Sequence, residues 1–290
     1  MCAPTNTNGQ PATPAEVQEK HVVIVGAGPS GLLLSNSLLH RNTLKEVNTT
    51  TNVQTQYKVT LVDSRIDVGV LDVDTELKAH RSWMIGLAGH GLEAIRSVPG
   101  LYEDYVSQKH VGVKISEFNI ILGSTEMKNS ASTDAGSDTE AFVVDRNYVC
   151  AAMAKFMHEK HSSNPLLERR YETDLMYVDS TNHRVLVRNK TTGKDEYLDY
   201  DLLVGADGSR SVVRDTFTRD VYDFEMDFGD MFNQFRAVHV ELPKNVGPTS
   251  ICLLPECIPC MTGILLPMPE GLCNISIGVP TNNFAKSPMS

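Results

Sequence analysis

A strand, a glycine-rich turn and a helix are predicted in close succession near the N-terminus, in the stretch VVIVGAGPSGLLLS. Gly26, Gly28 and Gly31 have the spacing G-x-G-x-x-G, between a β-branched run and leucines at helical spacing. The first glycine permits a tight turn, the second leaves room for a pyrophosphate, and the third lets the helix and strand pack closely. The N-terminus of the helix then offers backbone N–H groups to phosphates. The stretch predicts an α/β fold with a parallel sheet that binds an ADP-containing dinucleotide.

An acidic residue ends the next predicted strand, YKVTLVDSR, which should pair in parallel with the first. Asp63 lies 32 residues after Gly31, counting from position 31 to position 63, whereas the usual spacing is about 20. A surface insertion over the polar run 41–56 explains the excess, because added loop length costs little. We therefore expect Asp63 to accept hydrogen bonds from the adenosine ribose; the alternative is a solvated aspartate at a strand end.

A second predicted strand, turn and helix span residues 202–215, LLVGADGSRSVVRD. The strand stops at Asp207 and Gly208, and the helix carries Ser211 and Arg214. Gly208 permits close approach to the backbone, Asp207 can accept a hydrogen bond from a ribityl or ribose hydroxyl, and Arg214 can anchor the turn. The alternative is an ordinary loop followed by a capped helix. Two such turns in one chain suggest that they share a ligand.

The chain between the two turns does not continue with the repeated strand-helix-strand units of an NAD dehydrogenase. Asp145 is expected to cap a helix whose apolar stripe is explained by core packing. Residues 171–201 are expected to form antiparallel hairpins with turns at Thr181-Asn182 and Thr192-Gly193, and further strands follow Phe217. This order favours FAD over NAD as the dinucleotide of the first turn.

Charge and composition exclude some classes of function. The formal net charge of −10 has the wrong sign for binding nucleic acid through phosphates, so no nucleic-acid partner is expected. No apolar run is long enough for a membrane-spanning helix, and the polar N-terminus lacks the apolar core of a signal peptide, so we expect a cytoplasmic protein. Cys252, Cys257 and Cys260 could form a redox or metal site. No second cysteine pair is nearby to complete four zinc ligands, so we interpret them as small hydrophobes and expect no metal.

These stretches resemble the flavoprotein aromatic hydroxylases, single-component FAD monooxygenases with the p-hydroxybenzoate hydroxylase fold, and are most similar to the kynurenine monooxygenase branch. The resemblance covers about residues 21–285. In this family an Asp-Gly turn followed by Ser and Arg is a second fingerprint near the FAD pyrophosphate and the NAD(P)H site, and GADGSRSVVRD matches it. The resemblance implies that FAD is bound by Gly26, Gly28, Gly31, Asp63, Asp207 and Gly208.

Two arginines carry over by the same resemblance. Arg81, in HRSWMIGL, falls where the family places an arginine near the FAD diphosphate, and Arg146 falls where an arginine contacts the flavin nucleotide. Both roles suit a side chain that pairs with phosphate bidentately. The alternative for each is a surface ion pair.

The resemblance also implies the architecture, an α/β chain with a Rossmann-like FAD-binding domain and a partial β-sheet substrate domain. Accordingly we expect a disordered tail over 1–20, the FAD-binding domain over 21–110 and 142–216, and incomplete substrate-domain strands over 111–141 and 217–290.

The implied activity is hydroxylation of a small, aromatic substrate with molecular oxygen and NADPH or NADH as co-substrate; no catalytic residue is assigned. The same-fold alternative is a flavoprotein reductase or dehydrogenase without oxygen insertion, and a third is an inactive fragment.

Two departures from the family pattern modify these expectations. Kynurenine monooxygenases hold the substrate carboxylate with an arginine and a tyrosine from the following strands, and residues 111–141 contain neither, so an amino-acid substrate is not expected. The third family fingerprint, a Gly-Asp pair that opens a helix at the ribityl chain, should follow the strand ending near Val279 and is not found. We therefore interpret the sequence as C-terminally truncated relative to the family.

Overall fold

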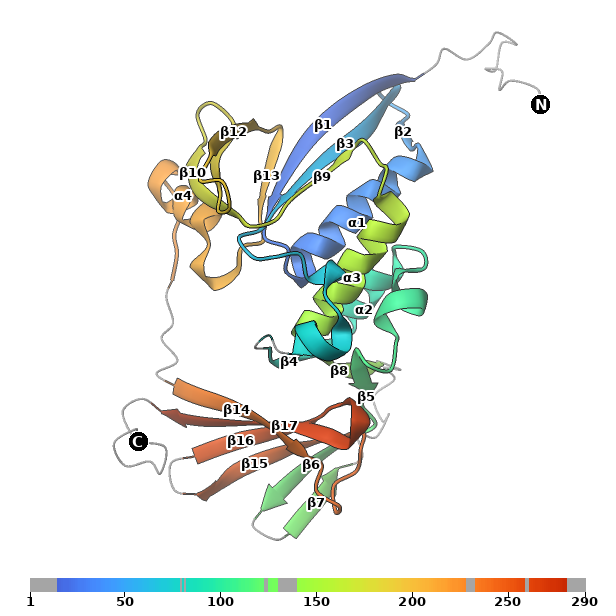
Figure 1. Ribbon diagram of the computed structural model, residues 1–290, viewed down its shortest axis with the longest axis vertical. Helices are drawn as coiled ribbons and strands as arrows, with labels where there is room; N and C mark the ends of the chain where they lie inside the picture. The colour runs from blue at the N-terminus through green and yellow to red at the C-terminus, as the bar shows by residue number, and fades with distance from the viewer. Residues whose placement is uncertain are drawn as a thin grey trace, which may run out of the picture. The chain divides into compact units, whose positions relative to one another are not determined.

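The computed structural model describes residues 15–78, 80, 82–122, 125–129, 140–227, 233–258 and 261–280 (Figure 1). The chain forms two compact units, the first of Met1–Ile66 with Ser163–Tyr222 and the second of Asp67–Ser162 with Asp223–Ser290. This division differs from the expected domain boundaries, because 67–110 and 142–162 group with the later strands instead of with the first glycine turn.

The first unit contains a five-stranded sheet with the order β13-β1-β3-β2, and β9 also pairs with β3. All pairings are parallel except that of β2 with β3. Buried β-branched and leucine side chains of β1 and β3 fill its core, and helix α1 packs against β3 (Figure 1). The elements are β1 (Glu16–Val25), α1 (Pro29–Leu44), β2 (Val47–Asn48), β3 (Val53–Val62), β9 (Leu167–Arg170) and β13 (Leu202–Gly205). The predicted strand, glycine turn, helix and parallel strand are thus confirmed.

Two segments differ from expectation. Strand β1 begins at Glu16, so it extends into the segment expected to be a disordered tail. The polar run 41–56 is not a single loop: α1 continues to Leu44, ends on Lys45 in the left-handed region, and is followed by a short β2–β3 hairpin. Asn48 supports that hairpin, because its side-chain oxygen accepts hydrogen bonds from the backbone of Thr50 and Thr51.

A three-stranded antiparallel sheet of β10, β11 and β12 completes the first unit, together with helix α4. Valines of these hairpins pack with Val23, Val25 and Val62 of the parallel sheet in one apolar core. The hairpin turns fall where the sequence predicts them, and Gly193 has a φ of +67°. The bounds are β10 (Thr173–Asp179), β11 (Arg184–Asn189), β12 (Asp195–Asp199) and α4 (Val212–Asp220).

The second unit contains helix α3 and a small antiparallel sheet of order β4-β8-β5. Asp145 caps α3 as predicted, because its carboxylate accepts hydrogen bonds from the backbone N–H groups of Asn147 and Tyr148. The apolar stripe of α3 is buried, as expected. The elements are η1 (Val68–Val70), η2 (Val73–Leu77), β4 (Met84–Ala88), α2 (His90–Arg96), η3 (Tyr102–Val106), β5 (Gly112–Lys114), β8 (Ala141–Asp145) and α3 (Arg146–His161).

A six-stranded sheet of order β14-β17-β16-β15-β6-β7 forms the rest of the second unit. Cys252 lies in its apolar core with Leu265 and Cys273, which supports its interpretation as a small hydrophobe; the side chains of Cys257 and Cys260 lie outside the described ones. The elements are β6 (Glu117–Leu122), β7 (Thr125–Asn129), β14 (Asn233–Glu241), β15 (Ser250–Ile258), β16 (Met261–Pro267), η5 (Pro269–Gly271) and β17 (Leu272–Pro280).

Among the described residues, none of the helices combines the length and hydropathy needed to cross a membrane.

Candidate functional site

The glycine turn after β1 fits tightly between two neighbouring strand ends. Gly26 has a φ of +107°, and a Cβ atom there would lie 2.2 Å from the carbonyl oxygen of Ala206, just after β13. The N–H of Gly26 donates to the carbonyl oxygen of Val62 at 2.7 Å, at the end of β3. Since both the backbone conformation and the space exclude a side chain, Gly26 is required by the turn itself.

The third glycine brings helix α1 against this turn. A Cβ atom at Gly31 would lie 1.9 Å from the carbonyl oxygen of Gly26. Gly28, the N-cap residue, has an extended conformation (φ −80°, ψ −178°) open to any residue, so the turn does not require a glycine there for its backbone. The first turn of α1 has neither a capping side chain nor an acidic residue, so its N–H groups and positive dipole end suit an anion such as a diphosphate.

Asp63 joins the end of β3 to the same turn. Its Oδ2 accepts a hydrogen bond from the N–H of Ala27 at 2.6 Å and its Oδ1 accepts one from the N–H of Arg65 at 2.8 Å. The guanidinium of Arg65 pairs with both oxygens, Nε to Oδ1 and Nη2 to Oδ2, each at 3.0 Å. Burial raises the pKa of Asp63, but the hydrogen bonds and charge of Arg65 and the N–H of Ala27 outweigh it, and the pKa lies below its ordinary value. The carboxylate is therefore ionised, and is only 6% exposed.

The second turn combines helix capping with an unused acceptor. Oδ2 of Asp207 accepts from the N–H of Val212 at 2.8 Å, at the start of α4, whereas its buried Oδ1 accepts no hydrogen bond from the described residues. Gly208 follows with a φ of +82°, and nothing lies within 4 Å of the position of a Cβ atom there. Turn η4 (Gly208–Arg210) leads into α4. Asp207 thus caps the helix and keeps one oxygen available for a ligand hydroxyl.

Two further contacts fix this turn. Oγ of Ser211 accepts a hydrogen bond from the N–H of Arg214 at 2.9 Å, and Nη2 of Arg214 donates to the carbonyl oxygen of Ser209 at 3.0 Å. Arg214 therefore anchors the turn, as expected. The alternative, a loop followed by a capped helix, is also present, because Ser211 caps α4.

The structure brings the two turns together at the carboxyl ends of neighbouring parallel strands. Val25 pairs with Gly205 in the β1–β13 ladder, and the N–H of Ala206 donates to the carbonyl oxygen of Val25 at 2.7 Å. One edge of this sheet therefore carries four features. They are the N-terminus of α1, the closely packed Gly26 and Gly31, the ionised carboxylate of Asp63 and the unused oxygen of Asp207. This arrangement fits the diphosphate and hydroxyl groups of FAD.

Of the two predicted arginines, the structure describes only Arg146. Arg81 lies outside the described residues. Arg146 is the first residue of α3 in the second unit, where its guanidinium carbon lies 5.5 Å from the centroid of the Trp83 ring and its N–H donates to the Trp83 carbonyl oxygen. A role of either arginine toward FAD remains a proposal.

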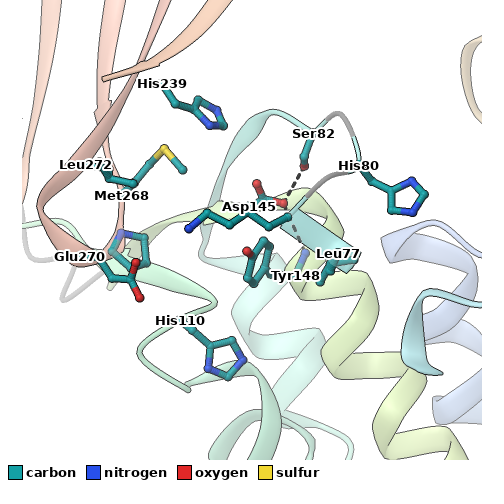
Figure 2. A pocket seen from close by; sticks show the side chains of 12 residues that line it. Leu77, His80, Ser82, His110, Asp145, Tyr148, His239, Met268, Glu270 and Leu272 are labelled. Carbon is teal, nitrogen blue, oxygen red and sulfur yellow. Dashed lines mark hydrogen bonds between the residues drawn. The ribbon is translucent and has the colours of Figure 1, made fainter. Parts of the chain in front are cut away.

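A cavity of about 110 Å³ in the second unit was not predicted from the sequence. Figure 2 shows His239 and Met268 facing Asp145 and Tyr148 across it. Its apolar lining includes Leu77, Met268, Pro269 and Leu272. A cavity of about 150 Å³ in another protein admits one benzene ring; this space is smaller, so it limits a ligand held entirely inside it to about that size or less.

Polar and charged groups of several elements line the same cavity. Oδ1 of Asp145 accepts a hydrogen bond from the hydroxyl of Ser82 at 2.6 Å and from the backbone N–H groups of Asn147 and Tyr148. This oxygen therefore holds the start of α3 in place. The other lining side chains that can carry charge are Lys78, His80, His110, His239 and Glu270. No three histidine, cysteine or acidic groups of the described part of the chain are arranged to hold a metal ion. The residues that line the cavity lie up to about 190 positions apart in the sequence and share no motif. For this reason they were not found from the sequence alone.

Comparison with protein families gives one match. Residues 107–267, more than half of the chain, match the FAD binding domain family. No curated protein matches the chain significantly by sequence.

Solved structures share the fold at low sequence identity. PqsL from Pseudomonas aeruginosa, described as a probable FAD-dependent monooxygenase, is similar over 93% of this chain and 63% of its own, with TM-score 0.59 and 17% identity. A flavoprotein/dehydrogenase from Cytophaga hutchinsonii is similar over 93% and 58%, with TM-score 0.66 and 14% identity. The flavin-dependent monooxygenase PieE, solved with FAD and substrate, is similar over 95% and 44%, with TM-score 0.68 and 15% identity. The chain thus spans less than two thirds of the length of these proteins.

Proposed function

Since the chain belongs to the FAD binding domain family, we propose that it is an FAD-dependent monooxygenase that hydroxylates a small aromatic substrate, with NADPH or NADH and molecular oxygen as co-substrates. The observation that carries the cofactor assignment is the edge of the parallel sheet in the first unit. There, Gly26 and Gly31 leave no space for side chains, and the N-terminus of α1 has no capping side chain of its own. Such a backbone surface favours a diphosphate over a protein side chain.

The other cofactor contacts follow from the same surface. Gly28 would lie closest to the diphosphate, Asp63 at the adenosine end, and Asp207 with Gly208 toward the ribityl side. By the resemblance to the aromatic hydroxylases, Arg81 and Arg146 would complete the contacts with the diphosphate and nucleotide. When bound, FAD supplies the redox chemistry that couples oxidation of a nicotinamide to reaction with oxygen.

We assign the cavity of the second unit to the substrate. Leu77, Met268 and Leu272 offer apolar contacts, and Lys78, His239 and Tyr148 can hydrogen-bond a polar substituent. No residue of this cavity is assigned a catalytic role.

A second candidate is a flavoprotein dehydrogenase without oxygen insertion. The observation that favours it is the similarity to the Cytophaga hutchinsonii flavoprotein/dehydrogenase, whose TM-score is higher than that of PqsL. That fold-level likeness does not extend to the chemistry of a site.

The test is to purify the chain with FAD and measure NADPH and NADH oxidation and oxygen uptake with a panel of single-ring phenols and aromatic acids. We expect one compound to stimulate oxygen uptake and to be recovered with an added hydroxyl group. The same assay under nitrogen, with an artificial electron acceptor, tests the dehydrogenase. Unchanged nicotinamide oxidation without a hydroxylated product would favour it. Failure to bind FAD would contradict both.

A further inference from the structure

A larger space lies beside the substrate cavity of the second unit. It is a groove of about 550 Å³, whereas the cavity measures about 110 Å³. We call it the outer groove; its walls are the chain over 69–77, the segment around η3 and one face of α3. On α3 the lining residues Ala152, Lys155 and Glu159 recur at helical spacing and so share that face. The described lining residues of the outer groove, like those of the cavity, all belong to the second unit.

Three side chains separate the outer groove from the cavity. Leu77, His110 and Tyr148 line both spaces, so they form the partition between them. The rings of His110 and Tyr148 lie next to each other, with centroids 6.2 Å apart, and Figure 2 shows Tyr148 between His110 and Asp145. Leu77 is buried, whereas His110 is exposed. Because Tyr148 is part of the partition, a change of its side-chain rotamer would join the two spaces.

The cavity alone is too small for a ring with a long substituent. A space of about 150 Å³ in another protein admits one benzene ring, so a cavity of about 110 Å³ is filled by a ring of that size or less. A longer substituent must extend out of it. On the side of Tyr148 the outer groove has the volume to receive such a substituent.

The outer groove carries an excess of negative charge. Among its described lining residues, acidic side chains outnumber lysines, the acidic ones being Asp72, Asp104 and Glu159 and the lysine being Lys155. Glu159 is held in place, because it accepts a hydrogen bond from the hydroxyl of Tyr105. Burial raises the pKa of Tyr105 to about 12, and Glu159 acts in the same direction, so this hydroxyl stays protonated and donates. A groove lined in this way attracts an ammonium group and repels a carboxylate.

We propose that the cavity and the outer groove form one substrate site, with the aromatic ring in the cavity and a flexible side chain that ends in an ammonium group in the groove. Tyr148 lies where the two parts meet, so it is the residue that sets the size of the substituent that passes. The inference rests on the proposed function, in which the cavity holds the substrate, and adds the substrate class, a single-ring arylalkylamine. An aromatic acid would place its carboxylate beside Asp104 and Glu159, which is unfavourable.

The experiment measures binding of para-substituted phenols to the FAD-loaded chain by titration calorimetry. Tyramine ends in an ammonium group, para-ethylphenol is its neutral counterpart, and para-hydroxyphenylpropionate ends in a carboxylate. We expect tyramine to bind at least about threefold more tightly than para-ethylphenol, and the propionate to bind most weakly. Since these compounds have the same ring, the differences in affinity report on the substituent.

Two substitutions test the groove and the partition separately, with bound flavin absorbance as the check on folding. Asp104→Asn should lower the affinity for tyramine about two- to fivefold and leave that for para-ethylphenol unchanged. Glu103→Gln is the matched control and should change neither, because Glu103 is an exposed acid next to Asp104 and is not one of the described residues that line the groove. Tyr148→Ala should improve binding of para-tert-butylphenol relative to phenol by at least about threefold, because the wider passage admits the branched substituent.

Failure of the inference and failure of the proposed function give different results. Tyramine that binds no more tightly than para-ethylphenol would overturn the inference alone, as would equal effects of Asp104→Asn on both ligands or an unchanged ratio for Tyr148→Ala. Loss of para-ethylphenol binding in Met268→Trp would support the cavity as the site of the ring. Undiminished binding in that variant, or an FAD-loaded chain that binds none of the phenols, would overturn the substrate assignment together with the inference.

Discussion

Gly31 lies so close to Gly26 that a Cβ atom on Gly31 would stand 1.9 Å from the carbonyl oxygen of Gly26. No rotamer can relieve such a contact, because both atoms belong to the backbone or are fixed to it. Gly31→Ala should therefore push α1 away from β1 and lower the free energy of unfolding by about 1–3 kcal/mol or more. Urea denaturation measures this, with Gly86→Ala as the control, because nothing lies within 4 Å of a Cβ atom there. Equal stability of the two variants would contradict the close packing of helix and strand.

Gly28→Val should abolish FAD binding while leaving the fold intact. The extended backbone of Gly28 is available to any residue, so the substitution requires no change of backbone conformation and adds bulk at the point where we place the diphosphate. Flavin absorbance after gel filtration measures binding, and far-ultraviolet circular dichroism monitors the fold. Gly86→Val is the matched control and should retain FAD. Undiminished binding by Gly28→Val would remove this glycine from the proposed site.

His21 should make stability depend on pH near neutrality. Burial lowers the pKa of His21 below its ordinary value of 6.5, and the positive charge of Lys58 acts in the same direction. As the pH falls below 6.5 the unfolded chain takes up a proton at this position before the folded chain does, so the free energy of unfolding decreases; above 6.5 this contribution is constant. Urea titrations on both sides of 6.5 should show a weaker pH dependence for His21→Gln than for wild type. Parallel curves for the two proteins would contradict the prediction.

Met268→Trp should block the cavity of the second unit without affecting the nucleotide turns. Met268 faces Asp145 and Tyr148 across a space of about 110 Å³, which the larger indole would occupy (Figure 2). We expect FAD binding to be retained and substrate-stimulated oxygen uptake to fall at least tenfold. Val238→Trp is the control, since Val238 is an exposed residue of β14. Unchanged stimulation in Met268→Trp would place the substrate elsewhere.

The parts of the fold that depend on neighbouring residues were predictable from the sequence. The glycine turn, the cap at Asp145 and the hairpin turn at Gly193 each follow from a few adjacent residues with a strong conformational preference. The run 41–56 was expected to be a surface insertion grown as a loop, because its threonines and asparagines favour turns. Asn48 does form a turn, but that turn joins a short local hairpin, in which Val47 and Asn48 of β2 pair with Gln54 and Val53 of β3.

The candidate site was predictable only in part, for a related reason. Motif spacing indicated Gly26, Gly31 and Asp207. It contains no information on which other residues of the chain hydrogen-bond to a predicted site residue. The engagement of Asp63 by Arg65 and Ala27 appears only when β3 is placed beside the glycine turn. The cavity around His239 and Tyr148 required the fold itself, because its residues come from distant strands and loops.

The contact between Gly26 and Ala206 has a consequence for synthesis of the chain. The strands β1 and β13, which end just before these residues, pair from Val22 with Leu202 to Val25 with Gly205, a sequence separation of 180 residues (202 − 22). At roughly 5–20 residues per second, a ribosome would complete the glycine turn about 9–36 s before it adds Ala206. During that interval one side of β1 has no partner strand from this pairing, so the nascent chain carries an open, apolar strand edge that a chaperone could protect.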